Sequence, residues 1–255
     1  MPTRVIALLL PGYSPNLSWL ARAVHADRAI LDDLHPFSRK SKVHRTKIRT
    51  PDGHQWLTIP FVREHRHKAI NQVRIDDRRP WSGHHLQALE YNYRNSPYFD
   101  FYEPEIRADF EIASRCGFLV DAVRHLMQRQ WLYLELPKFP QWASDLGPGA
   151  DTRADAGMDT GTDPSPGKSL YDAISDDRTI VWQEPDSRHY QRPHPIAVQN
   201  PAAVQTDTAT PVFHIPGYRQ HFPGFVPGCG LLDLLFEYGA DAWQVLDELT
   251  LKSKT

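Results

Sequence analysis

The chain has 255 residues, 40% hydrophobic and 24% charged, which is long enough to bury a sizeable core. A formal net charge of −2 argues against a protein built throughout for nucleic acid or anionic membranes. The early apolar run of residues 5–10 stops at Pro11-Gly12, too short for a membrane span and unlike a signal peptide. We therefore expect a cytoplasmic protein without membrane insertion.

The first segment has the pattern of a strand, a helix and a second strand. Residues 4–10 are typical of a buried strand, and Ser14 followed by Pro15 fits an N-cap with proline at the first helical position. Apolar residues then recur on one helical face, at Leu17, Leu20, Ala21 and Val24. A second strand is expected at residues 29–31, and this order begins an α/β sheet.

Further elements follow from turn signals and apolar spacing. Residues 43–50 and 55–62 are expected to pair as a hairpin, because Pro51-Asp52-Gly53 between them is a strong turn signal. The remaining patterns predict strands at residues 71–75 and 179–183, and helices at residues 82–95, 104–114, 118–134, 231–238 and 241–251. Asp241 and Gln244 are expected to act as a capping pair for the last helix.

The composition changes between residues 144 and 168, which contain no aromatic residue and are rich in Gly, Asp, Thr and Pro. Such a stretch buries too little surface to offset its ordering entropy, so we expect a flexible insertion. Residues 1–143 then form an N-terminal α/β part, and residues 169–255 complete the same domain. The predicted fold class is α/β, with a mixed sheet and flanking helices.

The turn before the first helix, Pro11-Gly12-Tyr13-Ser14, is a candidate phosphate site. Free N–H groups at a helix N-terminus favour anions, and Asp32 or Asp33 ends the next strand where a ribose-binding acid often lies. The turn contains neither GxGxxG nor GxxxxGK[ST], however, so an ordinary strand-to-helix turn is the alternative.

A strongly basic stretch at residues 38–49 is the second candidate. It carries six cations and no acid, and strand alternation places Arg45, Lys47 and Arg49 on one face. Three neighbouring cations repel one another and favour an anionic partner. The alternatives are solvated charge on a hairpin and, because aromatic residues are not interleaved, less readily a nucleic-acid surface.

Two further positions could transfer protons. His85 opens the helix that leads to Tyr93 and could be a general base, with helix capping or a surface position as the alternative. Glu184 and His189 follow the expected strand at residues 179–183 and form either an acid–base pair or a salt-bridged loop. The histidines have neither an HExxH pattern nor nearby thiols, so no metal site is predicted.

Asp233 lies inside the apolar run of residues 231–235 and therefore needs a partner. It could cap the first helical turn, pair with an internal arginine or contact a ligand. Cys116 and Cys229 are far apart in the sequence and are expected to be free, reduced thiols without a catalytic context.

The order of several short motifs resembles that of the WbqC-like family, which is tied to bacterial surface-polysaccharide gene clusters. In the first part of the chain these motifs are Asp32-Asp33, Arg45-Thr46-Lys47-Ile48 and the segment from Gly53 to Pro60. Farther along they are Trp81, His85, Tyr93, Pro97-Tyr98-Phe99, Tyr218, Gln220, Phe222, Phe225, residues 231–235 and Gly239. The resemblance spans about residues 4–137 and 170–250, with departures at Leu10-Pro11, Lys42-Val43 and Cys229-Gly230.

The resemblance implies an enzyme that tailors a nucleotide-activated sugar, by transfer of an acyl or aminoacyl group to an amino sugar. In this hypothesis no cofactor is needed, the basic residues hold phosphate, Asp33 orients a hydroxyl, and His85 or His189 moves a proton. The candidate catalytic residues are His85, Asp33, His189 and Glu184. The candidate substrate-binding residues are Lys40, Arg45, Lys47, Tyr93, Tyr98, Tyr218 and Gln220.

Two other classes of function stay open. A non-catalytic carbohydrate-binding or scaffolding protein is the first, and it is favoured if the polar clusters are scattered over the surface. A single-strand nucleic-acid binder is the second, and it predicts steeply salt-dependent affinity. The expected partner is a small nucleotide sugar, and the sequence does not fix the oligomeric state.

Overall fold

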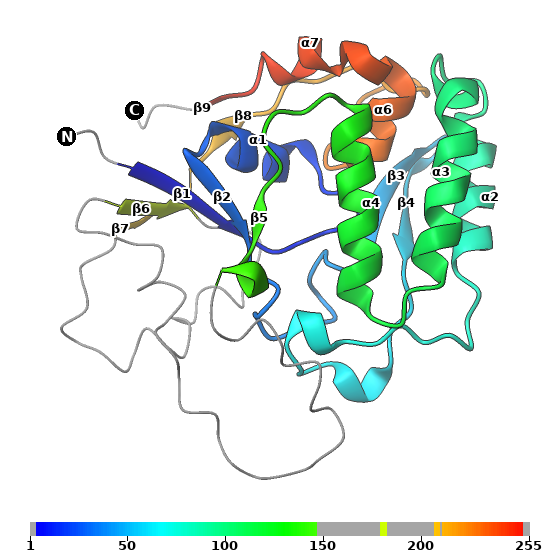
Figure 1. Cartoon of the computed structure of the whole chain (residues 1–255). Helices are drawn as coiled ribbons and strands as arrows, with labels where there is room; N and C mark the ends of the chain where they lie inside the picture. Colours follow the sequence, from blue (N-terminus) through cyan, green and yellow to red (C-terminus); the bar gives the residue numbers. More distant parts are fainter. Residues whose placement is uncertain (1–3, 147–178, 183–206, 210, 252–255) are drawn as a thin grey trace, which may run out of the picture.

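The computed structural model describes residues 4–146, 179–182, 207–209 and 211–251. Its main sheet has five strands, and every neighbouring pair is parallel (Figure 1). In spatial order these strands are β5 (Gln141–Trp142), β2 (Arg28–Leu31), β1 (Arg4–Leu9), β6 (Thr179–Trp182) and β7 (Asp207–Ala209). The predicted α/β class is confirmed, and the antiparallel strand pairs among the described residues lie in two separate two-stranded sheets.

Strand β1 is central to this sheet. It pairs with β2 on one side, where Leu9 lies opposite Leu31, and with β6 on the other, where Ala7 lies opposite Trp182. Helix α1 (Leu17–His25) makes the crossover from β1 to β2. The chain continues from β1 to β2 and β5 on one side of β1, whereas β6 and β7 lie on its other side. The carboxyl end of β1 is therefore a topological switch point, which is where open α/β sheets bind their ligands.

The strand residues alternate between two buried clusters, as the period of two requires. Ala7 and Leu9 join the main core with α1, whereas Ile6 and Leu8 belong to a smaller cluster on the other face. A continuous apolar run in the sequence thus corresponds to a strand covered on both faces.

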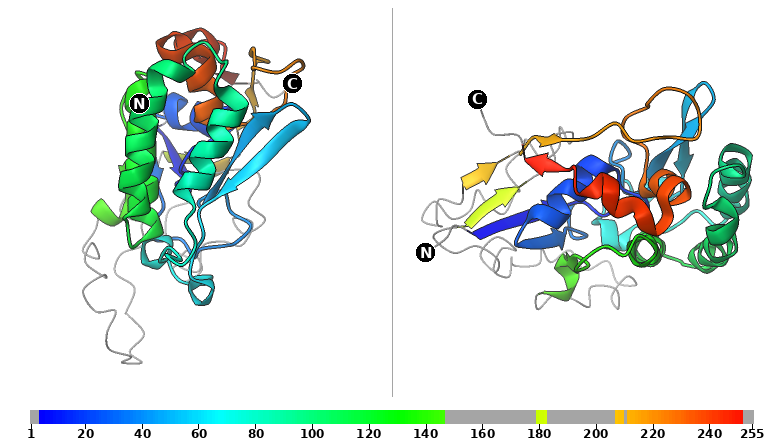
Figure 2. Two further views of the ribbon diagram at one scale, coloured as in Figure 1. Left: turned by 90° about the vertical axis from the view of Figure 1, so that its right-hand side faces the viewer. Right: turned by 90° about the horizontal axis from the view of Figure 1, so that it is seen from above.

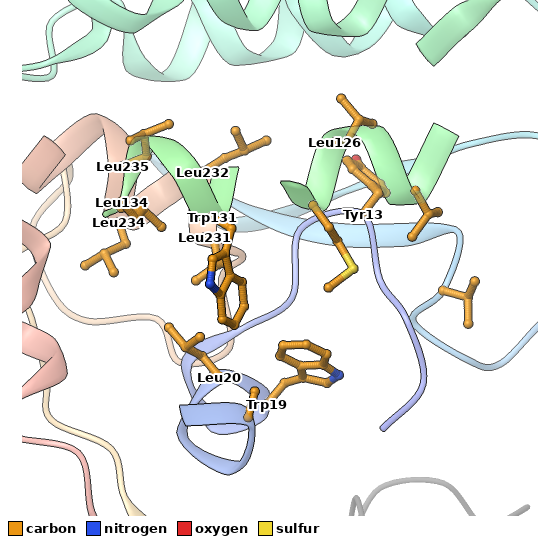
Figure 3. Close-up of a cluster of buried hydrophobic side chains, with 14 of the residues drawn as sticks. Tyr13, Trp19, Leu20, Leu126, Trp131, Leu134, Leu231, Leu232, Leu234 and Leu235 are labelled. Atoms are coloured by element: carbon orange, nitrogen blue, oxygen red, sulfur yellow. The ribbon is translucent and has the colours of Figure 1, made fainter. Parts of the chain in front are cut away.

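Figure 3 shows how the main core joins distant parts of the chain. Trp19 of α1 meets Trp131 of α4 (Leu119–Tyr133) edge to face, with ring centroids 6.4 Å apart. Leucines of α6 (Leu231–Tyr238) lie beside this pair. Each such side chain, when fully buried, stabilises the fold by about 1.5–3 kcal/mol. The core therefore ties the sheet to the C-terminal part.

Helices α2 (Ser82–Tyr93), α3 (Phe99–Ser114) and α4 stand side by side on the side of the molecule away from β6 (Figures 1 and 2). Asp109 of α3 is buried and clamps α3 to α4. Its carboxylate accepts hydrogen bonds from His125 at 3.1 Å, Arg129 at 3.0 Å and the Tyr133 hydroxyl at 2.6 Å. A buried carboxylate with three donors is well compensated, so this cluster is a structural clamp.

The predicted hairpin is confirmed as β3 (Arg45–Thr50) and β4 (Gly53–Thr58). Gly53 has φ 130°, a conformation that favours glycine and explains why the turn needs one. In Figure 2 the hairpin extends beside α2 as a separate layer.

The shorter elements join these layers. They are the 3-10 turns η1 (Arg63–His65), η2 (Ile70–Gln72), η3 (Ala143–Asp145) and η4 (Gly239–Ala242), helix α7 (Trp243–Leu246), and the antiparallel strands β8 (Phe213–His214) and β9 (Thr250–Leu251).

Several local predictions were wrong. The N-cap of α1 is Asn16, whose side chain accepts from the Trp19 N–H at 3.0 Å, and Ser14 instead bonds to distant segments. Residues 71–75 form no strand, because η2 begins the segment and Ile75 makes only an isolated bridge to Phe61.

The ends of two helices also differ from the prediction. Helix α3 begins at Phe99, five residues before the predicted start at Pro104, so Pro104 lies inside the helix, in its second turn. Proline favours a helix start but does not require one. The predicted helix at residues 241–251 is divided among η4, α7 and β9. Asp241 does not cap α7, since its carboxylate accepts from the Tyr98 hydroxyl at 2.9 Å.

The first two residues of the predicted insertion, residues 144–168, belong to a regular element. Ser144 and Asp145 belong to η3, and residues 147–168 lie outside the described residues.

Candidate anion-binding site

A cavity of about 530 Å³ opens at the carboxyl end of β1. Three parts of the chain line it: the loop after β1 with the start of α1, the basic stretch with β3 and β4, and the segment before α6. Its described lining residues are Leu10, Pro11, Gly12, Ser14–Trp19, Lys40, Lys42, Val43, Arg45, Thr46, Lys47, Trp56, Ile215, Tyr218, Phe225 and Pro227–Cys229. The cavity is large enough for a drug-sized ligand and lies at the switch point of the sheet.

One wall of this pocket is basic. Arg45 and Lys47 rise from the same face of β3 and lie over the Trp56 ring of β4, with their charged groups 4.5 Å and 5.4 Å from the ring centroid. The Arg45 guanidinium also donates to the Lys40 carbonyl at 2.8 Å, which ties the preceding basic loop to the strand. Lys40 and Lys42 complete the wall.

The charged side chains among the described lining residues all have the same sign. Among the described lining residues there are four Lys or Arg side chains and no Asp, Glu or His. A concave, partly apolar surface with one sign of charge concentrates ligands of the opposite sign. The pocket therefore has the electrostatics of an anion site.

Arg49 was predicted to share the basic face with Arg45 and Lys47, but its side chain is buried. Its guanidinium donates to the carbonyl oxygens of Thr50, of Gly53 at 3.0 Å and of Pro223 at 2.6 Å. Strand alternation placed Arg49 correctly, but the segment before α6 covers it. This arginine holds two segments together and does not line the pocket.

The floor of the pocket is a crossing of three backbones. The Thr46 hydroxyl donates to the Ser14 carbonyl at 2.6 Å, and the Gly230 N–H donates to the Lys47 carbonyl at 2.9 Å. Gly230 has no room for a side chain, because an added Cβ would lie 2.6 Å from the Ser14 carbonyl oxygen. The glycine at residue 230 is thus required by close approach.

Three predicted binding residues converge on Asp233, behind the pocket wall. The hydroxyls of Tyr93 and Tyr218 each donate to its carboxylate at 2.6 Å, and the Gln220 amide donates at 2.8 Å. Burial raises the pKa of Asp233, and these three hydrogen bonds oppose the rise. The partners of Asp233 are therefore tyrosine and glutamine side chains. From the first turn of α6, its carboxylate accepts hydrogen bonds from all three of them.

This network has one member at the cavity, since Tyr218 lines it while Tyr93 and Gln220 do not. The Arg49 N–H donates to the Tyr93 hydroxyl at 2.8 Å, which extends the network to β3. Tyr98, the remaining predicted tyrosine, lies outside this network and bonds Asp241.

The acidic pair at the end of β2 forms a different cluster. The Asp33 carboxylate accepts from the Ser144 N–H at 3.0 Å and its hydroxyl at 2.7 Å. Burial raises the pKa of Asp33, and burial together with the neighbouring Asp33 charge raises the pKa of Asp32 to about 7. Neither aspartate is among the residues that line the pocket.

His85 lies in the aromatic core. Its ring stacks on Tyr13 with centroids 5.9 Å apart, and its Nε2 is 3.2 Å from the Thr58 carbonyl. Burial lowers the pKa of His85 to about 4, so the ring is neutral at physiological pH. His85 does not line the pocket, and neither the cap nor the surface alternative describes it.

The other predicted residues are placed as follows. Glu184 and His189 lie outside the described residues. Cys116 and Cys229 are free, as expected, and Cys229 lines the pocket. Burial raises the pKa of the Cys229 thiol to about 12, which leaves it protonated and poorly nucleophilic.

Sequence reasoning missed Trp56 and the floor residue Thr46. Ser14 belongs to the turn that was predicted as a candidate phosphate site, and Pro11, Gly12 and Ser14 of that turn line the pocket. Trp56 could have been found, because it lies opposite Lys47 if the hairpin is paired in register around its turn. The roles of Ser14 and Thr46 depend on contacts across more than thirty residues, for which the sequence carries no local signal.

The fold and the site define a class: α/β proteins with a parallel sheet and a basic pocket at its switch point. A family model described as the WbqC-like protein family matches residues 11–245, and the chain belongs to that family. The chain is similar to the uncharacterized protein Rv1507c of Mycobacterium tuberculosis, with 24% identity over 93% of this chain and 95% of that protein. No solved structure matches the chain.

Among the described residues, no helix is long and apolar enough to cross a membrane. In the same part of the chain, no three His, Cys, Asp or Glu side chains are grouped so that they could hold a metal ion.

Proposed function

We propose that this protein binds a nucleotide-activated sugar in the basic pocket and acts in a transferase-like step of bacterial surface-polysaccharide biosynthesis. The observation that carries the proposal is the pair of cations Arg45 and Lys47, which lie together over the Trp56 ring in a pocket with no carboxylate among its described lining residues. Phosphate groups are the usual anionic partners of clustered Arg and Lys. Membership in the WbqC-like family is consistent with this proposal.

In this proposal the phosphates of the ligand lie against Arg45 and Lys47, and the apolar wall covers the rest of the ligand. That wall includes Leu17, Trp19 and Phe225. Charge-assisted hydrogen bonds contribute about 1.5–3 kcal/mol each, so the two cations account for much of the affinity. Asp33 and His85 lie away from the pocket lining, so the proposal assigns them no contact with the phosphates.

A second candidate is a non-catalytic binding protein for the same class of ligand. It is favoured by one observation: the described lining includes no imidazole or carboxylate that could act as a general acid or base. The two candidates differ in turnover. Acylation of the sugar amine in the presence of an acyl donor, with release of the donor's carrier group and with the nucleotide still attached to the sugar, supports the transferase-like step. Tight binding without any conversion supports the second candidate.

The test is a binding measurement by calorimetry with a panel of nucleotide sugars. Arg45→Ala with Lys47→Ala should weaken binding of the preferred ligand at least tenfold, because both charge-assisted contacts are lost. Arg63→Ala with Lys68→Ala is the matched control, since it removes one arginine and one lysine that are exposed and outside the pocket.

Equal affinity in the two double variants would refute the proposed site. Preference for short oligonucleotides over every nucleotide sugar would replace the proposal with nucleic-acid binding, and that affinity should fall steeply as salt is added.

A further inference from the structure

Trp56 occupies an unusual place in the basic wall. Its ring lies opposite Lys47 across the hairpin and also contacts the guanidinium of Arg45, so two cations share one aromatic side chain. All three residues line the cavity. The contacts fix how the charged groups are presented to a ligand.

Holding two cations beside each other is unfavourable unless something offsets their repulsion. Attraction to an aromatic ring offsets part of it, by about 0.5–2 kcal/mol for each cation. An anion between the charged groups would offset the remainder. The charge of Arg49, the third cation on this face, is compensated within the protein instead. Its guanidinium donates hydrogen bonds to backbone carbonyls and lies 5.6 Å from the Phe222 ring.

The spacing of the two cations indicates the kind of anion. Arg45 and Lys47 leave the strand two residues apart on one face, about 7 Å along the backbone. Both charged groups then converge on the same ring, so each of them can contact one of two adjacent anionic groups.

We infer that Trp56 is a positioning residue that presents Arg45 and Lys47 as a pair to a ligand with two adjacent phosphates. This inference rests on the proposed function and goes beyond it by naming the diphosphate linkage as the recognised group. A nucleoside diphosphate and inorganic pyrophosphate therefore bind more tightly than their monophosphate counterparts, and the difference depends on Trp56.

The test compares four probes, uridine diphosphate, uridine monophosphate, inorganic pyrophosphate and inorganic phosphate, on four proteins. The proteins are the wild type, Trp56→Leu, Trp56→Phe and the control Trp243→Leu, which removes a tryptophan that is 56% exposed and outside the pocket. Dissociation constants come from calorimetry, and melting temperatures confirm that each protein is folded.

In the wild type and in Trp243→Leu, each diphosphate should bind at least tenfold more tightly than its monophosphate. In Trp56→Leu, diphosphate affinity should fall about tenfold while monophosphate affinity changes little, so that the ratio approaches one. Trp56→Phe should retain most of the ratio. A purely structural role for Trp56 would lower all four affinities together and leave the ratio unchanged.

Three results overturn the inference: a ratio near one in the wild type, an unchanged ratio in Trp56→Leu, or an equal loss for all probes. If Trp56→Leu does not fold, Trp56→Tyr and Trp56→Phe decide the question, since the ratio should be largest with tryptophan. If nucleotide sugars still bind through Arg45 and Lys47, only the inference fails. If no probe or nucleotide sugar binds the wild type, the proposed function fails with it.

Discussion

Asp32 stands at the carboxyl end of β2 with none of its side chain exposed to solvent. The Nδ1 atom of His35 is 3.7 Å from the Asp32 carboxylate. Burial and the adjacent Asp33 charge raise the pKa of Asp32 to about 7, well above the value of an exposed aspartate. The ionised form is therefore disfavoured in the folded state, and the residue links stability to pH.

Asp32→Asn should stabilise the protein at alkaline pH. The folded state holds the Asp32 proton up to about pH 7, whereas the unfolded chain releases it near pH 4, so wild-type stability falls as pH rises through this window. The unfolding free energy of the variant minus that of the wild type should grow by about 1.4 kcal/mol per pH unit and then level off above pH 7. Urea unfolding between pH 4 and pH 9 measures it.

The difference between the two proteins is the proper readout, because other groups titrate in the same range. Burial lowers the pKa of His44 and His85 to about 4, and these groups reduce the stability of both proteins as pH falls below about 6.5. Asp52→Asn, in the exposed hairpin turn, controls for the loss of a carboxylate. A difference that stays constant from pH 4 to pH 9 would show that Asp32 ionises normally.

At the scale of elements, the structure depends on where α6 begins. Gly230 precedes α6 and forms an isolated bridge with Asn16, while its N–H bonds β3. The Leu231 N–H donates to the Pro15 carbonyl at 2.9 Å, and the Leu232 N–H to the Ser14 hydroxyl at 3.2 Å. One tight crossing thus sets the position of α1, β3 and α6 relative to one another.

Gly230→Ala should destabilise the fold by about 1–3 kcal/mol, because the methyl group would overlap the Ser14 carbonyl and the Thr46 hydroxyl. Gly83→Ala is the matched control. It lies in α2 with open space around it, so the same substitution there should be neutral or stabilise by up to about 1 kcal/mol. Urea unfolding of both variants gives the comparison, and equal effects would contradict the close packing at Gly230.

At the scale of the whole molecule, the pocket joins segments that are far apart in the chain. Its walls come from residues 10–19, residues 40–56 and residues 215–229, and the Asp233 network connects the last of these to α2. A ligand that contacts all three walls stabilises them together, because it binds only the state in which they are assembled.

Hydrogen–deuterium exchange tests this arrangement. Saturating nucleotide sugar should slow amide exchange in all three segments at once, since local opening of any one of them releases the ligand. Helices α3 and α4, which lie outside the pocket lining, provide the internal reference. Protection confined to residues 40–56 would place the ligand on the surface of the hairpin and would contradict a three-walled site.

The sequence by itself determined the elements whose signals are local. The apolar run of β1, the turn Pro51-Asp52-Gly53 and the helical spacing of α2 and α4 each specify their own backbone, and all were predicted close to their observed bounds. The basic face of β3 could also be predicted from the sequence, because the alternation of side chains along a strand is a local property. Family membership was likewise recognisable from the order of short motifs.

Only the tertiary structure decided what those residues do. It buried Arg49 against Pro223, put His85 in the aromatic core, and gathered Tyr93, Tyr218 and Gln220 around Asp233. Each outcome depends on a partner that is distant in sequence, and the free energy of such a contact includes desolvation and chain closure, which no local pattern encodes. The basic residues were therefore visible in the sequence, whereas the pocket they line exists only where three distant segments meet.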